Sequence, residues 1–313
     1  MPKPPHPTPE RDYAPFFWLL LPPLFWASNI VAGRAVVDTV SPFTLTPLRW
    51  LLGAFLLSLL CGRQLWRERF LVREEWPKLI LYSITAIIGV NILAYFAVLH
   101  TEAVNAAIVN GLLPIVIILA SWIGLGERLT RRQTLGVTIS FLGIVVVAAR
   151  GSLDVLLGLQ LNPGDLFMLA ALTMWGTYSV AYRRFKTRFS PLPFATIIAF
   201  LGALLTLPLM VWDIGTGGRL PDTPQLMGIV VYIALFPSCA ALLIWNRAVA
   251  AVGPNTAGYF TNLIPVYGSL LAVGLLGEAF HPYHIVGIFL IFVGIYFAVV
   301  SARTAPPDAR RIG

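Results

Sequence analysis

The sequence predicts an all-α integral membrane protein in which ten transmembrane helices form two inverted five-helix repeats. The first reason is composition, since 58% of the residues are hydrophobic, 12% are charged and the mean hydropathy is +0.80. These values lie far outside those of soluble domains. The second reason is that the apolar residues form continuous runs of about 20, long enough to cross a bilayer as helices, whereas a barrel would show alternation.

The third reason is an internal repeat. At an offset of 149 the matched pairs include Trp26 and Trp175, Ser41 and Ser190, and Gly53 and Gly202; at 151 they include Pro114 and Pro265, Glu127 and Glu278, Gly136 and Gly287, and Gly143 and Gly294. Each half holds five apolar spans, so the second copy enters the bilayer from the opposite side. Such inverted repeats are typical of secondary transporters that work by alternating access.

The apolar runs define the elements in order. The spans cover residues 15–37, 43–62, 78–98, 104–125, 132–150, 164–185, 191–213, 224–246, 254–276 and 282–302. The first is longer than the apolar core of a signal peptide and belongs to the repeat, so we expect it to be retained. Pro163-Gly164-Asp165 predicts a turn and cap that open the sixth span.

We expect one membrane domain. It comprises a first repeat over 15–150, a linker over 151–163 and a second repeat over 164–302, with short disordered ends at 1–14 and 303–313 that are too polar to fold. Cys61 and Cys239 are the two cysteines and lie on distant spans, which excludes a disulfide framework and a cysteine-based metal site.

Loop charges predict the orientation. Of the 22 basic residues, 18 lie in the ends and connections of one side, whereas Arg150 and Arg219 lie in connections of the other. By the positive-inside rule both termini are cytoplasmic, and the 151–163 linker is on the outer side of the membrane. The net charge of +8 is then loop charge that faces anionic lipid, and we expect no nucleic-acid partner.

Several of these motifs carry a family resemblance. They are Trp26-Ala-Ser-Asn, Leu48-Arg49, Pro114, Gly126-Glu127, Gly136 and Gly143. Together they resemble the EamA-type members of the drug/metabolite transporter superfamily over about residues 15–302, and the chain looks most like the YddG-type bacterial exporters of aromatic and other amino acids. The resemblance implies a ten-helix fold, a central cavity between the halves and export of small metabolites.

Aromatic and amide residues recur at helical spacing, which predicts a binding surface for an organic solute. The candidate substrate-binding residues are Trp26, Asn29, Arg49, Tyr82, Asn91, Tyr95, Trp175 and Tyr178. Tryptophan and tyrosine offer flat apolar surface with one polar tip. The alternative is the interfacial aromatic belt, although Trp26 and Trp175 lie deeper in their spans than a belt requires.

Charge inside the spans is scarce. No Asp or Glu falls in the middle of a span, so the sequence shows no site for a proton relay through a buried carboxylate. Transport is therefore either facilitative or unconventionally coupled. Arg49 is the one charge inside a helical run. It either anchors a substrate carboxylate or snorkels to the outer interface and pairs with an acid such as Asp38.

Proline and glycine occupy matched places. Pro114 and Pro265 lie near the middle of the fourth and ninth spans, where each removes a backbone hydrogen bond and predicts either a hinge or a static kink. Gly136 and Gly143, like their repeat partners, permit close helix contact with another helix of the chain or with a second protomer. We expect a monomer.

Other functions are less well supported by the residues. A sugar, nucleotide-sugar or drug carrier of the same superfamily is the alternative, although a nucleotide-sugar carrier should carry more basic residues inside its spans. A membrane enzyme that acts on lipid-linked substrates is a remote alternative, because the sequence shows no nucleophile, metal set or acid–base pair. His281 and His284 are expected to be an ordinary helix-start pair. We therefore expect no catalytic site, metal or cofactor.

The orientation can be tested by single-cysteine labelling in intact cells. A cysteine at Ser152 should react with an impermeant maleimide, whereas one at Ser301 should not, because the charge distribution places position 152 outside and position 301 inside. The reverse pattern would overturn the orientation and the count of five spans per half.

Overall fold

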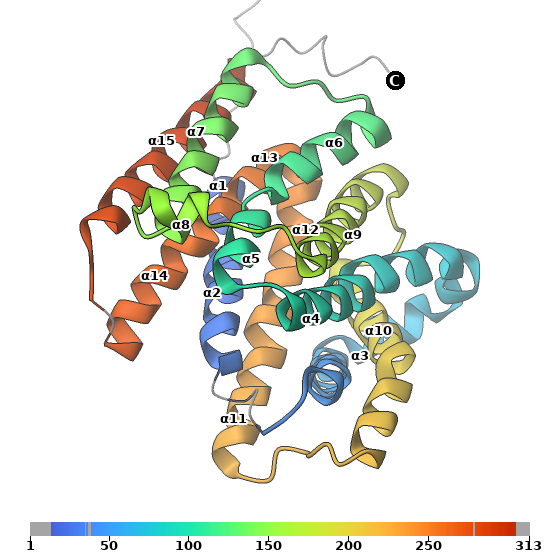
Figure 1. Cartoon of the computed structure of the whole chain (residues 1–313). Helices are drawn as coiled ribbons and strands as arrows, with labels where there is room; N and C mark the ends of the chain where they lie inside the picture. Colours follow the sequence, from blue (N-terminus) through green and yellow to red (C-terminus); the bar gives the residue numbers. More distant parts are fainter. Residues whose placement is uncertain (1–13, 35, 37–38, 278, 305–313) are drawn as a thin grey trace, which may run out of the picture.

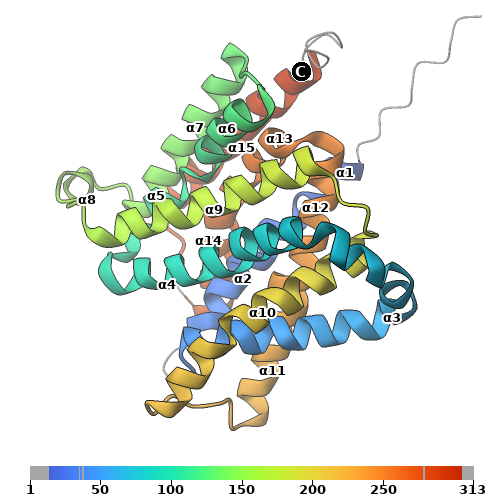
Figure 2. The ribbon, with the colours of Figure 1, turned by 90° about the vertical axis from the view of Figure 1, so that its right-hand side faces the viewer.

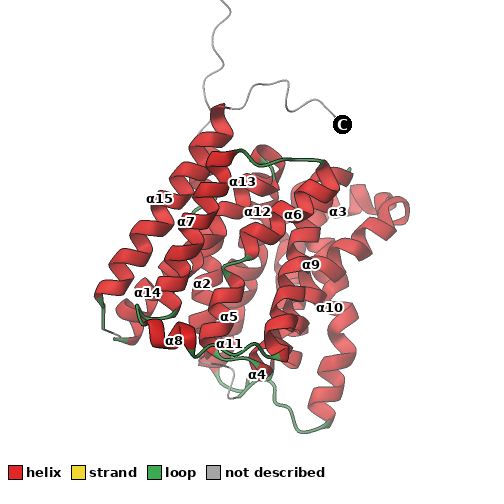
Figure 3. Cartoon of the chain, turned by 45° about the horizontal axis from the view of Figure 1, so that its top comes forward, coloured by secondary structure: helices red, strands yellow, loops and turns green. Residues whose placement is uncertain are grey.

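The structure is a bundle of helices (Figure 1). This computed structural model describes residues 14–34, 36, 39–277 and 279–304. Within these ranges every regular element is a helix and none is a strand (Figure 3), which confirms the predicted all-α fold class. Most residues of the two ends predicted to be disordered lie outside the described residues.

Most of the described residues of every predicted span fall on helix. The first half contains α1 (Ala14–Trp18), α2 (Leu21–Arg34), α3 (Pro42–Ser83), η1 (Ile84–Gly89), α4 (Val90–His100), α5 (Ala103–Asn110), α6 (Leu113–Leu125) and α7 (Arg131–Ala148). The second half contains α8 (Leu153–Leu157), α9 (Pro163–Phe185), α10 (Pro191–Gly215), α11 (Pro224–Ile233), η2 (Ala234–Ala240), α12 (Ala241–Val252), α13 (Pro254–Tyr259), η3 (Phe260–Asn262), α14 (Leu263–Leu276) and α15 (Pro282–Thr304).

Eight helical stretches of the described chain are long and apolar enough to cross a membrane. One of them, Pro42–His100, has 59 residues and holds two predicted spans. It bends at Cys61, whose φ of −122° and ψ of 17° are not helical, and Figure 2 shows α3 leading away from the bundle and then back toward α4. The helix α9 is not among the eight, so the count of ten passes stays a prediction.

Local signals explain where the helices start and stop. The predicted cap of the sixth span is confirmed, because Asn162 and Asp165 form a reciprocal capping box at the start of α9. The glycine of the repeated Gly-Glu motif ends a helix in each half. Gly126 and Gly277 end α6 and α14 with φ values of 70° and 69°, a left-handed conformation that glycine adopts without strain.

The helices of the two halves pair in a pattern that is unchanged when the halves are exchanged. The most extensive contacts join α3 to α10 and α7 to α15, and both pairs unite helices that correspond in the repeat. The α3–α10 pair is tied at both ends, since the N-cap hydroxyl of Ser41 donates to Asp213 at 2.5 Å and that of Ser190 donates to Glu68 at 2.6 Å.

The glycine stripes form the α7–α15 contact within the chain. A Cβ atom on Gly136 would lie 2.5 Å from the carbonyl oxygen of Gly294, and one on Gly143 would lie 2.7 Å from that of Gly287. The backbones therefore touch as small residues permit in membrane helices. These glycines serve an intramolecular contact.

This contact generates a stability prediction. Gly136→Ala should destabilise the protein by about 1–3 kcal/mol, because the added methyl group must push two backbones apart. Gly268→Ala is the matched control within a helix, since nothing lies within 4 Å of its added Cβ. Thermal unfolding of the two purified variants in detergent measures the difference, and equal midpoints would contradict the close contact.

Candidate functional site

A cavity of about 280 Å³ lies in the middle of the bundle and is walled by both halves. Five of the eight predicted substrate-binding residues line it, namely Trp26, Asn29, Arg49, Asn91 and Trp175. They come from α2, α3, α4 and α9, and Ile30 of α2 is 52% exposed at the wall. This volume suits a small organic solute.

Four interruptions of the membrane helices also contribute to the wall. The segments η1 and η2 are π-helical, residues 111–112 separate α5 from α6, and the 3-10 segment η3 separates α13 from α14. The wall residues within or beside them are Ala86, Asn110, Leu113, Pro237, Ser238 and Ile264. Non-helical backbone at membrane depth is tolerated where it faces protein or a water-filled cavity. The four breaks meet this condition because they lie beside the cavity.

The interruptions are matched in pairs by the repeat. Ile84 and Ala234 begin the two π-helical segments 150 positions apart. Pro114 lies in the first turn of α6, and its counterpart Pro265 is the third residue of α14, each just after a break. The prolines thus mark the interruptions of the fourth and ninth spans. The sequence analysis missed the π-helical pair, although Gly89 ends η1 and Pro237 lies inside η2 as breaker signals.

Arg49 reaches the cavity and is held by amides. Its guanidinium donates to the Oδ1 atom of Asn29 at 3.5 Å and to that of Asn91. No carboxylate belongs to the described residues of the wall, and Arg49 forms no ion pair with any described residue. Asp38, the acid considered as its partner, lies outside the described residues.

Asn91 connects Arg49 to a π-helical segment. Its side-chain nitrogen donates to the carbonyl oxygen of Ile87, in η1, at 2.6 Å, while its oxygen accepts from Arg49. One amide therefore bonds a backbone carbonyl of the π-helical segment and orients the arginine.

Indole rings form the apolar part of the cavity. The ring of Trp26 meets that of Trp175 edge-on with centroids 5.2 Å apart, and Trp245 lies 5.5 and 5.6 Å from these two rings. Three buried donors of wall residues have no hydrogen-bond partner in the described chain: Arg49 Nε, Trp50 Nε1 and Trp175 Nε1. Unpaired buried donors are costly, so a polar group that came within reach of one of them would be stabilised there.

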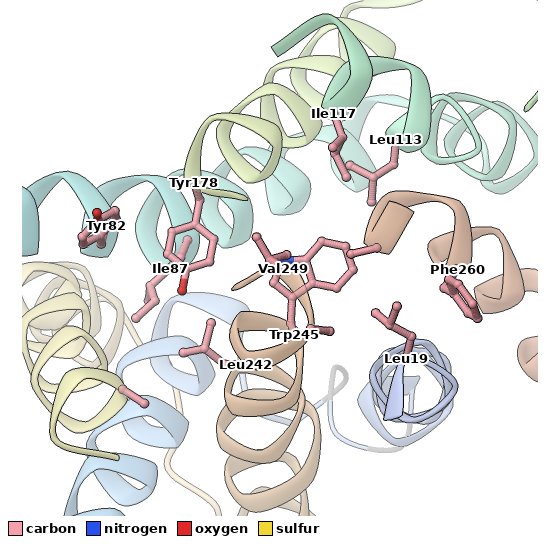
Figure 4. Close-up of a cluster of buried hydrophobic side chains, with 14 of the residues drawn as sticks. Leu19, Tyr82, Ile87, Leu113, Ile117, Tyr178, Leu242, Trp245, Val249 and Phe260 are labelled. Atoms are coloured by element: carbon pink, nitrogen blue, oxygen red, sulfur yellow. The ribbon is translucent and has the colours of Figure 1, made fainter. Parts of the chain in front are cut away.

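The two predicted residues Tyr82 and Tyr178 do not line the cavity; with Trp245 they are packed behind its wall residue Trp175. Figure 4 shows Tyr178 and Trp245 between α9 and α12. The Tyr178 hydroxyl donates to Asn246 at 2.6 Å, and Trp245 Nε1 donates to Ser179 at 3.1 Å. We call Tyr82, Tyr178, Trp245 and Asn246 the aromatic plug; all four are buried.

The plug lies toward the helix ends that carry basic residues. Along α9 the cavity residue Trp175 is followed by Tyr178 and then by Arg183 and Arg184. Those two arginines donate to the carbonyl oxygens of Ala250 and Gly124 and so tie the ends of α9, α12 and α6 together.

Glu127 and Tyr95 both lie outside the cavity wall. Glu127, in the connection after α6, accepts from the side chain of Asn255 at 2.7 Å, and burial raises the pKa of its carboxyl, whereas Arg183 opposes this rise. Tyr95, the remaining predicted binding residue, packs edge-on against Phe43 with ring centroids 4.7 Å apart and is not part of the wall.

Comparisons with known proteins agree with this architecture. Residues 14–149 and 162–300 each match the model of the EamA-like transporter family. The chain is 27% identical to the uncharacterized transporter YyaM of Bacillus subtilis, over 72% of this chain and 74% of that protein. It is 26% identical to a probable terminal-alkyne amino-acid exporter of Streptantibioticus cattleyicolor, over 91% and 93%. A solved crystal structure shares the fold with a TM-score of 0.78 at 23% identity, covering 94% of this chain and 99% of that one.

Proposed function

The chain belongs to the EamA-like transporter family, and from this premise we propose that it exports amino acids, including aromatic ones, across the bacterial cytoplasmic membrane. It is a multi-pass membrane protein of a transporter family and not an enzyme. The observation that carries the substrate proposal is the cavity, in which two indole rings stand beside an arginine that has no acidic partner among the described residues.

In this proposal the substrate carboxylate binds Arg49. A guanidinium presents a fixed fork of donors, and Nε of Arg49 is free to complete a two-point contact with a carboxylate. The side chain of the substrate packs against Trp26 and Trp175, and the free indole N–H of Trp175 accommodates a polar substituent. The amino-acid exporter among the relatives supports the same substrate class.

Alternating access fits the arrangement of the two halves. With the orientation predicted from loop charges, the aromatic plug closes the cytoplasmic side and the cavity faces outward. The repeat pairs Trp245 with Tyr95 and Tyr178 with Asn29, so the residues that close one end have counterparts near the other. We propose that these counterparts close the outer side when the plug opens.

Transport into liposomes tests the function directly. Purified protein should move amino acids down their concentration gradient, and it should do so without an imposed pH gradient because no carboxylate lies at mid-membrane. Failure to move any amino acid, together with transport of sugars or nucleotide sugars, would overturn the substrate class. Strict dependence on a pH gradient would overturn the facilitative mechanism alone.

Removing an indole of the wall should impair transport selectively. Trp175→Ala should reduce transport most for substrates with large side chains, since a lost stacking contact costs about 0.5–1.5 kcal/mol beyond the lost area. Trp122→Ala is the control, because Trp122 is exposed on α6 and does not line the cavity. If a stably expressed Trp175→Ala protein matched wild type for every substrate, this wall would not belong to the path.

Straightening the broken helices should slow the cycle. The Pro114→Ala, Pro265→Ala double variant supplies a backbone N–H just after each break, which can bond across the break and so favour one facing state. Turnover should fall more than substrate affinity does. Pro208→Ala is the control, since Pro208 lies inside α10 and does not line the cavity. Normal turnover in the double variant would refute a hinge at these positions.

A further inference from the structure

The connection between the second and third predicted spans is helical although it does not need to cross the membrane. Residues 62–77 continue α3 beyond the bend at Cys61, and Figure 2 shows this part of α3 projecting beyond the bundle at the right. The corresponding connection of the second half, residues 216–223, contains no helix. The repeat is therefore broken at this segment, which we call the projecting helix.

Each acidic side chain of the projecting helix forms hydrogen bonds within the protein. They bind the α9–α10 loop, and the pairs are Glu68 with Ser190, Glu74 with Arg188, and Glu75 with Thr187 and Arg188. Glu75 is buried and Glu68 partly buried in these contacts, at hydrogen-bond distances of 2.6–3.1 Å. The loop thus holds the face of the helix that carries Glu68 and Glu75, and it pairs one arginine with Glu74.

The opposite face is aromatic and basic. Trp66 and Phe70 are 69% and 65% exposed and lie one helical turn apart. Two pairs of exposed arginines, each at the same one-turn spacing, flank them on either side: Arg63 with Arg67, and Arg69 with Arg73. The Arg69 guanidinium lies 4.1 Å from the ring centroids of both Trp66 and Phe70.

We propose that this face of the projecting helix lies on the membrane surface and binds anionic lipid headgroups. Aromatic rings flanked by arginines characterise helices that lie in the interface, where the rings enter the acyl boundary and the cations reach phosphates. The exposed side chains of Leu59 and Leu60, just before the bend, continue the face into the lipid-exposed end of the second span. Charge complementarity selects anionic over zwitterionic lipid.

Trp66 provides a reporter for the test. Full-length protein and its Trp66→Phe variant are each reconstituted in vesicles that contain brominated phosphatidylglycerol or brominated phosphatidylcholine. The fluorescence of Trp66 is the difference between the signals of these two proteins. The anionic lipid should quench Trp66 preferentially. In Arg63→Gln, Arg67→Gln, Arg69→Gln, Arg73→Gln this preference should be lost, because the variant removes the four cations that attract anionic headgroups.

Two variants separate the proposal from nonspecific effects. Arg128→Gln, Arg131→Gln, Arg132→Gln removes an exposed basic cluster elsewhere on the same side and should leave the preference unchanged. The four arginines changed to lysine should retain the preference, which controls for misfolding. Equal quenching of Trp66 by both lipids in wild type, quenching by neither, or an unchanged preference in the glutamine variant would overturn the proposal.

Discussion

Within a bilayer, every backbone N–H and C=O group must find a partner in the protein or in a water-filled cavity, and this constraint governs the whole structure. It explains why the apolar spans of the described chain are helical apart from short breaks. It also explains why the two π-helical segments and the two breaks before Pro114 and Pro265 gather around one cavity. The irregular backbone therefore depends on the cavity beside it.

Asn91 links the binding chemistry to the backbone irregularity. Because the same amide accepts from Arg49 and donates to the Ile87 carbonyl, a change in the position of Arg49 alters a hydrogen bond of η1. A substrate carboxylate that draws the guanidinium into the cavity would act on that bond. In the proposed transport cycle, this contact is a direct physical route from substrate binding to the shape of the third span.

Much of this architecture follows from simple patterns in the sequence. Apolar run length predicted the spans, identical residues at fixed offsets predicted which helices correspond, and matched prolines indicated two of the four interruptions. Helical spacing placed Trp26, Asn29 and Trp175 on one surface. Spacing could not show that Tyr178, one turn from Trp175, turns toward Asn246 and does not line the cavity, because tertiary packing decides that direction. The π-helical segment η1 has Gly89 as its only breaker, and glycine is too common in membrane helices for that residue alone to predict the segment.

The central claim is that Arg49 holds a substrate carboxylate inside an aromatic cavity. The most direct test compares the affinity of phenylalanine with that of phenethylamine, which has the same side chain and no carboxylate, for wild type and Arg49→Gln. Wild type should prefer phenylalanine, and the variant should lose about ten-fold or more of that preference while its affinity for phenethylamine does not fall. An unchanged preference in a correctly folded Arg49→Gln protein would contradict the claim.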